Sequence, residues 1–213
     1  MLKNLLKRIC YRIYLIGKLE EQRIDAGLNE ISLQQKAIIG KDTRIGDVNL
    51  IQNSTGDNTR IRVGNSSWIN AHLLVFGHGG EITVGDHCFI GKDSQLWSAR
   101  KISVGDRVLI SHNVNIHDNI SHPLDAEERH ADYMHLFNTG DFQTTNDLNE
   151  KEIIIEDDVW IGFNVTILKG VTIGKGAIIG ACTLVKNDVP AGAVVVGNPA
   201  RIIRYADQAA MSV

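Results

Sequence analysis

Histidine can act as a base, a metal ligand or a packed side chain, and residues 111–130 hold four of the chain's eight. The stretch reads "SHNVNIHDNISHPLDAEERH", with His112, His117, His122 and His130. An imidazole that titrates near pH ~6.5 is suited to taking a proton from a substrate hydroxyl at neutral pH. The H-x4-H spacings from 112 to 117 and from 117 to 122 would also suit a zinc site. The surrounding sequence pattern decides between these chemistries.

Composition limits the class of protein. The 213 residues carry a net charge of −3, with 43% hydrophobic and only 6% aromatic residues, which favours one globular domain with a core of small aliphatics and disfavours general nucleic-acid binding. Cys10, Cys88 and Cys182 are scattered without a CxxC pair, which is typical of reduced thiols. No apolar run approaches the ~20 residues of a membrane span, and the N-terminus does not resemble a signal peptide. We therefore expect a cytoplasmic protein.

An aliphatic residue recurs at every sixth position in the second half of the chain. The row is Ile155, Ile161, Ile167, Ile173, Ile179 and Val185. The same phase appears upstream, for example in Val84, Ile90 and Leu96. A period of six fits neither a helix nor a single strand, but it fits a three-sided solenoid in which each hexad supplies one short strand and one corner. The sequence predicts an all-β solenoid with Ile155 stacked on Ile173.

The repeat stops at His122 and resumes at Ile155. Residues 122–152 are polar, and we expect them to form a long inserted loop. Long loops in compact domains are usually functional or disordered, and interruptions of a solenoid tend to lie on its binding face. Shorter interruptions are expected at 57–62, 78–83 and 97–103.

Residues 1–30 differ from the rest, because their apolar residues follow a helical spacing. Five basic residues precede the first acid, Glu20: Lys3, Lys7, Arg8, Arg12 and Lys18. This amphipathic helix would either cap the solenoid or pack in an oligomer, or it would lie on an anionic membrane surface. The expected organisation is a helix over 1–30, a solenoid domain over 31–204 and a tail over 205–213.

The "IGxxVx" hexads across residues 39–190, with the ending "GNPAR", resemble the hexapeptide-repeat acyltransferases. That resemblance implies a left-handed parallel β-helix that forms homotrimers, with active sites in the clefts between adjacent prisms. "HPLDAEER" is similar to the segment that follows the catalytic histidine of maltose and galactoside O-acetyltransferases, which implies that His122 is the general base. His117 is the alternative base. The candidates to orient the imidazole are Asp118, Asn115 and Asp125.

The resemblance also implies acetyl-CoA as the donor. In the family, the residue matching Trp160 lies against the pantetheine arm, and the backbone N–H of the residue matching Phe163 donates to the thioester oxygen. Basic residues after the last hexads hold the coenzyme phosphates, for which arginine is well suited. The expected coenzyme contacts are Trp160, Gly162, Phe163, Gly180, Lys186, Arg201 and Arg204.

The basic N-terminal helix followed directly by the solenoid resembles O-acetyltransferases of surface-polysaccharide pathways. This implies a saccharide acceptor from O-antigen, capsule or exopolysaccharide synthesis, with possible contact at the inner face of the membrane; we expect Asn115, Asp118 and Trp97 to contact it. The alternatives are an N-acyltransferase acting on an amino sugar, a zinc enzyme like the γ-class carbonic anhydrases, and a non-catalytic scaffold. The zinc alternative would add His87, His78 or His72 to His112 and His117. The R-x-D and Q-D elements of that class are missing, so we expect no metal.

Overall fold

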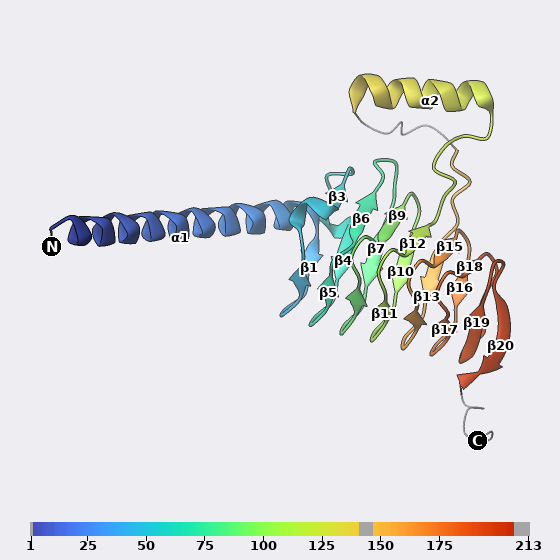
Figure 1. Cartoon of the computed structure of the whole chain (residues 1–213). Helices are drawn as coiled ribbons and strands as arrows, with labels where there is room; N and C mark the ends of the chain where they lie inside the picture. The colour runs from blue at the N-terminus through green and yellow to red at the C-terminus, as the bar shows by residue number, and fades with distance from the viewer. Residues whose placement is uncertain (1, 141–146, 207–213) are drawn as a thin grey trace.

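The computed structural model describes residues 2–140 and 147–206 as a left-handed parallel β-helix with a long N-terminal helix and an inserted second helix (Figure 1). Three sheets form the sides of a prism. In spatial order, the first contains β1 (Ile38–Ile39), β4 (Ile61–Val63), β7 (Ile82–Val84), β10 (Ile102–Val104), β13 (Ile153–Ile155) and β16 (Thr172–Ile173). The second contains β2 (Arg44–Ile45), β5 (Trp68–Ile69), β8 (Phe89–Ile90), β11 (Leu109–Ile110), β14 (Trp160–Ile161), β17 (Ile178–Ile179), β19 (Ala193–Val196) and β20 (Arg201–Tyr205). The third contains β18 (Leu184–Val185), β15 (Thr166–Leu168), β12 (Asn115–His117), β9 (Gln95–Ser98), β6 (His72–Val75) and β3 (Ile51–Asn53).

The six-residue period is confirmed by the strand register. Ile155 pairs with Ile173 and Ile161 pairs with Ile179, so each inward aliphatic stacks on its equivalent in the next coil. These side chains are fully buried and form one continuous core along the prism. Parallel strands at ~4.8 Å spacing leave room inside only for side chains of this size, which explains the scarcity of rings.

The chain departs from the repeat mainly along one edge of the prism. The segments 54–60, 76–81, 99–101 and 118–152 all connect a strand of the third sheet to the next strand of the first sheet. They include a short 3-10 helix, η2 (Asn58–Arg60), whereas a second one, η1 (Val48–Leu50), precedes β3. We name this row of connections the insertion edge. The predicted interruptions therefore lie side by side, although they are far apart in sequence.

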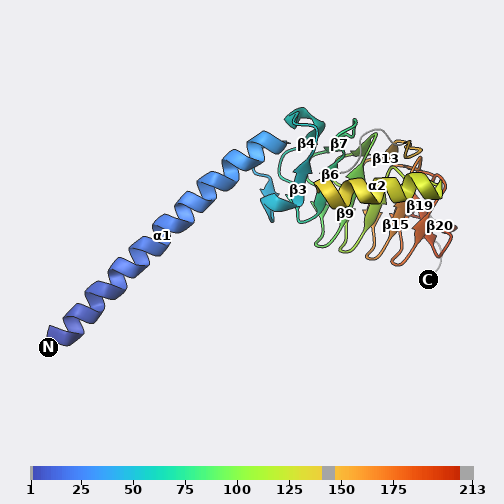
Figure 2. The ribbon, with the colours of Figure 1, turned by 90° about the horizontal axis from the view of Figure 1, so that it is seen from above.

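The large insert is more ordered than predicted, because it contains the helix α2 (Ala126–Thr139). Asp125 caps its N-terminus by accepting bonds from the backbone N–H groups of Glu127 and Glu128, at 2.9 and 3.0 Å. Gly140 ends it in the left-handed conformation, with φ of 78°. These cap residues are ordinary helix signals, so the expectation of a structureless loop was wrong for this part. Figure 2 shows α2 lying lengthwise over the prism.

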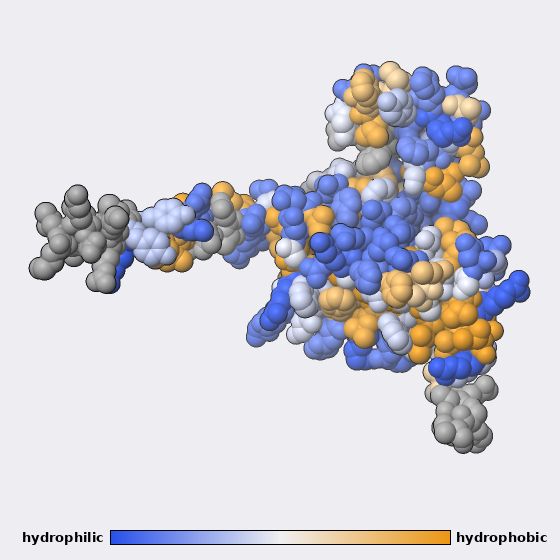
Figure 3. All heavy atoms as spheres, viewed as in Figure 1, coloured by the Kyte–Doolittle hydropathy of each residue, from blue (hydrophilic) through white to orange (hydrophobic). Residues whose placement is uncertain are grey.

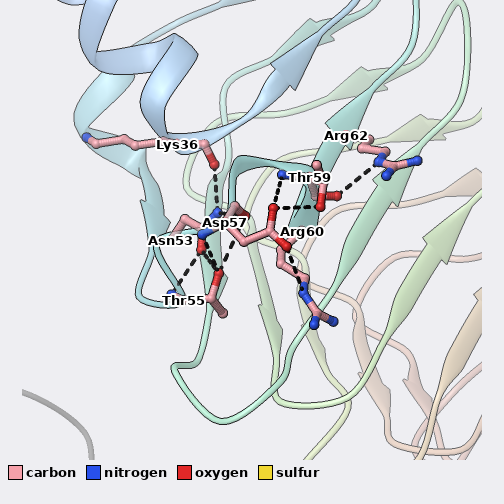
Figure 4. Close-up of polar contacts among 7 residues, drawn as sticks. All are labelled: Lys36, Asn53, Thr55, Asp57, Thr59, Arg60 and Arg62. Carbon is pink, nitrogen blue, oxygen red and sulfur yellow. Dashed lines mark hydrogen bonds and ion pairs between the residues drawn. The ribbon is translucent and has the colours of Figure 1, made fainter.

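The N-terminal helix α1 (Leu2–Lys36) is longer than the predicted 1–30, and only its end touches the prism. Leu33 packs against the core, and the following Ala37 is buried in it. The amide of Asn53 donates to the Lys36 carbonyl at 2.8 Å, as Figure 4 shows, and the amide of Asn58 donates to the Gln34 carbonyl at 2.8 Å. These bonds satisfy two carbonyls at the helix C-terminus. The last turn of α1 therefore caps the first coil, while the rest extends away from the prism (Figures 1 and 2).

Threonine, aspartate and arginine side chains secure the corner that receives α1. Asp57 accepts a bond from the Thr59 hydroxyl at 2.7 Å and pairs with Arg60 at 3.6 Å, and Arg62 donates to the Thr59 carbonyl at 3.0 Å (Figure 4). At the opposite end of the prism, β20 pairs antiparallel with β19 and ends at Tyr205, the first residue of the predicted tail. Residues 207–213 of that tail lie outside the described residues.

Candidate active site

His122 stands at the start of the large insert and pairs with a carboxylate from α2. Its Nδ1 lies 2.7 Å from Oδ2 of Asp132. The His122 side chain is 44% exposed, whereas that of Asp132 is only 7% exposed. When Nδ1 carries the proton and donates to this carboxylate, Nε2 is left as the acceptor. An exposed imidazole fixed by a buried carboxylate is the arrangement of a general base.

Asp132 was missed by the sequence analysis, which considered Asp118, Asn115 and Asp125 as the orienting group. Those candidates are replaced by Asp132, because Asp125 caps α2 and Asp118 is committed to bonds inside the prism. The available signal was the helix itself. If a helix is predicted to begin after Asp125, Asp132 lies two turns along it. A helix that folds back toward its own start can then bring the Asp132 carboxylate to His122, which precedes the helix in sequence.

Asp118 holds the insertion edge together and is fully buried. Its carboxylate accepts bonds from the Ser98 hydroxyl at 2.7 Å, the Ala99 and Arg100 backbone N–H groups at 2.8 and 2.9 Å, and the Asn119 amide at 3.0 Å. A buried carboxylate requires this many donors. The expectation that Asp118 contacts the acceptor is therefore corrected, since its oxygens face the interior.

His117 and Trp97 lie next to each other on the outer face of the third sheet. Their rings stack at 4.8 Å with an interplanar angle of 10°, so His117 covers one face of the indole. The Trp97 Nε1–H donates to Nδ1 of His72 at 3.1 Å. The same indole packs against a small buried cluster that includes Leu148 from the returning part of the insert. Stacking of a sugar on the face that His117 covers is thereby excluded, and Trp97 instead anchors the base of the insert.

Burial favours the neutral form of His117 and of His72. It lowers the pKa of both, and in His117 the neighbouring Asp118 opposes the shift. The Nε2 atoms of both rings are buried and have no hydrogen-bond partner among the described residues. An atom that water does not reach cannot collect the proton of an acceptor hydroxyl, so the geometry favours His122 over His117 as the base. Asn115 lies on the same outer face, beside Gln95.

The histidine pair considered for zinc does not converge. His112 stacks on Phe163 at 5.3 Å with an interplanar angle of 4°, and His117 stacks on Trp97. No group of three or more His, Cys, Asp or Glu side chains in the described ranges is arranged to hold a metal ion.

The predicted coenzyme residues are distributed over several sides of the prism. Gly162 and Phe163 form a corner between the second and third sheets, and Trp160 faces outward from the second sheet with 52% exposure. The backbone N–H of Phe163 donates to no acceptor within the described part of the chain. A Cβ on Gly162 would lie 2.7 Å from the Ala181 nitrogen, so glycine is required by the next coil. A Cβ on Gly180 would likewise lie 2.6 Å from Val196 Cγ1, which gives that residue a structural role.

The basic residues predicted to bind the coenzyme also lie at different places on the prism. Lys186 follows β18, on the continuation of the insertion edge, whereas Arg201 and Arg204 are exposed on β20 at the end of the second sheet. One coil before Lys186, Lys169 occupies the same edge and donates to the Asn149 carbonyl at 2.6 Å. Lys169 was not among the predicted residues. One chain thus places His122 and two lysines on one edge, whereas the Phe163 N–H and Trp160 lie elsewhere on the prism.

Comparison with known proteins agrees with this fold. Residues 152–187 match the model described as bacterial transferase hexapeptide (six repeats), and residues 81–117 match the hexapeptide repeat of succinyl-transferase. Galactoside O-acetyltransferase of Escherichia coli K12 is 32% identical over 142 residues, which are 67% of this chain and 62% of that protein. Two segments of the chain therefore match hexapeptide repeats of transferases, and a larger part of it is similar to an O-acetyltransferase.

Two solved structures extend the comparison. A galactoside acetyltransferase in complex with coenzyme A has 29% identity and a TM-score of 0.53, over 68% of this chain and 64% of that one. A hexapeptide-repeat-containing acetyltransferase of Vibrio cholerae has 26% identity and a TM-score of 0.54, over 89% of this chain and 93% of that one. The match to the galactoside enzymes thus spans less than two thirds of their length, while the match to the Vibrio protein is nearly complete.

Proposed function

We propose that the protein is an acetyl-CoA-dependent O-acetyltransferase that modifies a sugar hydroxyl, with His122 as its general base. The observation that carries this proposal is the exposed His122 imidazole held by the buried Asp132 carboxylate at 2.7 Å. The likeness to galactoside O-acetyltransferase and to an acetyltransferase bound to coenzyme A supports the donor and the type of acceptor.

The reaction is a direct transfer. Nε2 of His122 removes the proton of the acceptor hydroxyl as its oxygen bonds to the thioester carbonyl carbon. The carbonyl oxygen becomes negatively charged in this step and accepts a hydrogen bond from the Phe163 N–H. The intermediate then expels the coenzyme A thiolate, which takes the proton from the imidazolium. Asp132 holds the ring through Nδ1 and stabilises the transient positive charge.

A homotrimer would complete the site. His122 lies at the edge between the third and first sheets, whereas Phe163 lies at the edge between the second and third. Because these edges lie on different sides of the prism, His122 and Phe163 of the same chain cannot both contact the thioester of one acetyl-CoA. Adjacent copies related by a threefold axis can bring unlike edges together, so one copy supplies His122 and its neighbour supplies Phe163 and Trp160.

The acceptor we propose is a precursor of a surface polysaccharide. Hydrophilic residues dominate the part of the prism that faces α2 in Figure 3, as contacts to sugar hydroxyls require. The free thiols, Cys88 buried and Cys182 exposed, fit a reaction carried out in the cytoplasm.

The test is acetyl transfer from acetyl-CoA to a panel of sugars by the wild type, His122→Ala and His117→Ala. We expect His122→Ala to lose at least about 10²-fold in kcat. Alkaline hydroxylamine should release the product acetyl group, because it cleaves esters and leaves amides. An alkali-stable product would instead establish N-transfer to an amino sugar. Full activity of His122→Ala with loss in His117→Ala would refute the base assignment, and loss of activity with a chelator, together with stoichiometric zinc, would refute the whole proposal.

Complementation between subunits tests the shared site. Trp160→Ala and His122→Ala variants, each nearly inactive alone, should regain part of the wild-type rate when they are refolded together, because a mixed trimer contains some sites with both native residues. The matched control mixes His122→Ala with Asp132→Asn. Both substitutions affect the part of the site that one copy supplies, so no site in a mixed trimer has both native residues and the rate should not recover. Equal rates for the two mixtures would argue against a site between copies.

A further inference from the structure

The helix α1 is an exposed amphipathic element whose partner lies outside a single chain. At 1.5 Å per residue its 35 residues extend about 52 Å, and its contacts to the prism involve only the first coil. Along its described part, Ile16, Ile24, Leu28 and Ile31 are between 56% and 66% exposed. A lone helix in water gains little from its own hydrogen bonds, so a helix of this length needs its apolar face covered.

Eight of the Leu and Ile residues follow one side of this helix. At 100° per residue, the helix positions 2, 6, 9, 13, 16, 24, 28 and 31 fall within an arc of about 120°. All of them are Leu or Ile, and the row is interrupted at Glu20. Tyr11, Tyr14, Leu15 and Leu19 are also exposed, outside this arc. Figure 3 shows apolar and hydrophilic side chains together on the visible part of the helix.

The charges of the first half of α1 favour one kind of partner. Positions 3, 7, 8, 12 and 18 are basic, they lie outside the apolar arc, and residues 2–19 contain no acid. Parallel copies of such a segment would repel one another and offer no opposite charge to pair with. An anionic lipid surface offers negative headgroups to the basic side chains and an acyl boundary to the apolar row. Within the described residues, no helix is long and apolar enough to cross a membrane.

We infer that α1 lies along an anionic membrane surface and holds the prism beside it. The apolar row enters the headgroup boundary, the five basic residues contact anionic headgroups, and the last turn transmits this attachment through Leu33 and the Asn53 and Asn58 amides. This inference does not depend on the proposed reaction, since it concerns residues that take no part in the site.

The experiment is co-sedimentation of the full chain with vesicles of pure phosphatidylcholine and of phosphatidylcholine with about 30% phosphatidylglycerol. We expect at least tenfold stronger binding to the anionic vesicles, weakening as salt is raised from about 0.15 to about 0.5 M. The neutralising variant K3Q/K7Q/R8Q/R12Q should lose most of this preference, so its binding to the anionic vesicles should fall at least about tenfold. The matched control, E21Q/D25N, removes acids instead and should bind somewhat more tightly.

A second variant separates the membrane from a helix bundle. I16E/I24E puts two charges into the apolar row and should abolish vesicle binding while leaving the mass measured by light scattering unchanged. Acetyl-CoA hydrolysis in solution should also stay unchanged in both variants, which shows that the prism is intact. Equal binding to both kinds of vesicle, or no binding, would overturn the inference. A fall in molecular mass in I16E/I24E would show that copies of this helix cover one another instead.

Discussion

His122 and Asp132 are joined through Nδ1 and Oδ2 at 2.7 Å, although ten residues and a helix start separate them. The pair exists because α2 turns back over the prism and carries a nearly buried carboxylate to an exposed imidazole. In the proposed reaction, Asp132 is a positioning residue that fixes which nitrogen of His122 faces the acceptor.

Asp132→Asn should lower kcat by about 10²-fold or more, because an amide can also donate to Nδ1 and select the wrong tautomer. The KM for acetyl-CoA should change little, since Asp132 does not touch the coenzyme in the proposed site. Asp132→Glu should restore part of the rate. Steady-state kinetics measure both effects, with the exposed Glu128→Gln on the same helix as the control. A parallel rise in KM and loss of α2 helicity would indicate a structural role alone.

Asp118→Ala should destabilise the fold by about 2–4 kcal/mol, because four donors at the base of the insert lose their acceptor in a buried place. Urea unfolding followed by circular dichroism measures the change in free energy. Glu128→Gln should change it by less than about 0.5 kcal/mol. A similar small effect for Asp118→Ala would contradict the structural role assigned to this carboxylate.

Stability should decline as the pH falls from about 7.5 to 5. Burial lowers the pKa of His72 and His117 in the folded state, so below pH ~6.5 the unfolded chain binds more protons than the folded one. Their stabilising effect is present above that unfolded pKa and is lost as the pH falls through it toward the folded values. The slope per histidine stays below about 1.4 kcal/mol per pH unit, because each ring takes up at most one proton.

The measurement is urea unfolding at several pH values, with the double variant His72→Gln/His117→Phe. This variant keeps an acceptor for the Trp97 indole and a ring to stack on it, and its stability should vary less with pH. Phe137→Leu, on the exposed surface of α2, is the control and should keep the wild-type slope. If the double variant keeps the wild-type slope of stability against pH, groups other than His72 and His117 cause the pH dependence.

Gly162→Ala should lower the free energy of unfolding by about 1–3 kcal/mol, since its Cβ would press on the Ala181 backbone at 2.7 Å. Backbone cannot move aside as a flexible side chain can, so the coil spacing itself must change. Thermal unfolding provides the measurement. Gly27→Ala, where a Cβ meets nothing within 4 Å, should leave the prism's transition in place.

Lys186→Ala should raise the KM for acetyl-CoA about tenfold with little change in kcat, because a cation on the insertion edge attracts the coenzyme phosphates in the ground state and in the transition state alike. Lys169→Ala should act in the same direction. Lys41→Ala, at a corner of the first coil, is the matched control. An unchanged KM in both edge variants would place the phosphates at Arg201 and Arg204 instead.

The sequence alone determined the architecture of this protein. A period of six among Ile, Val and Leu side chains repeats the same steric demand in every coil, so Ile155 necessarily stacks on Ile173 and Ile161 on Ile179. The sequence also indicated His122 as a functional residue, because the position at which the six-residue period stops can be read directly from the sequence.

Tertiary structure decided what surrounds His122. Whether Asp118 or Asp132 reaches the imidazole depends on which carboxylate the prism buries and where α2 folds back, and no local spacing encodes that choice. The same holds for His117 and Trp97, which are twenty residues apart and stack only because successive coils bring them into register. Contacts between equivalent positions of uninterrupted coils follow from the repeat, whereas contacts made by or next to an insertion follow from its packing.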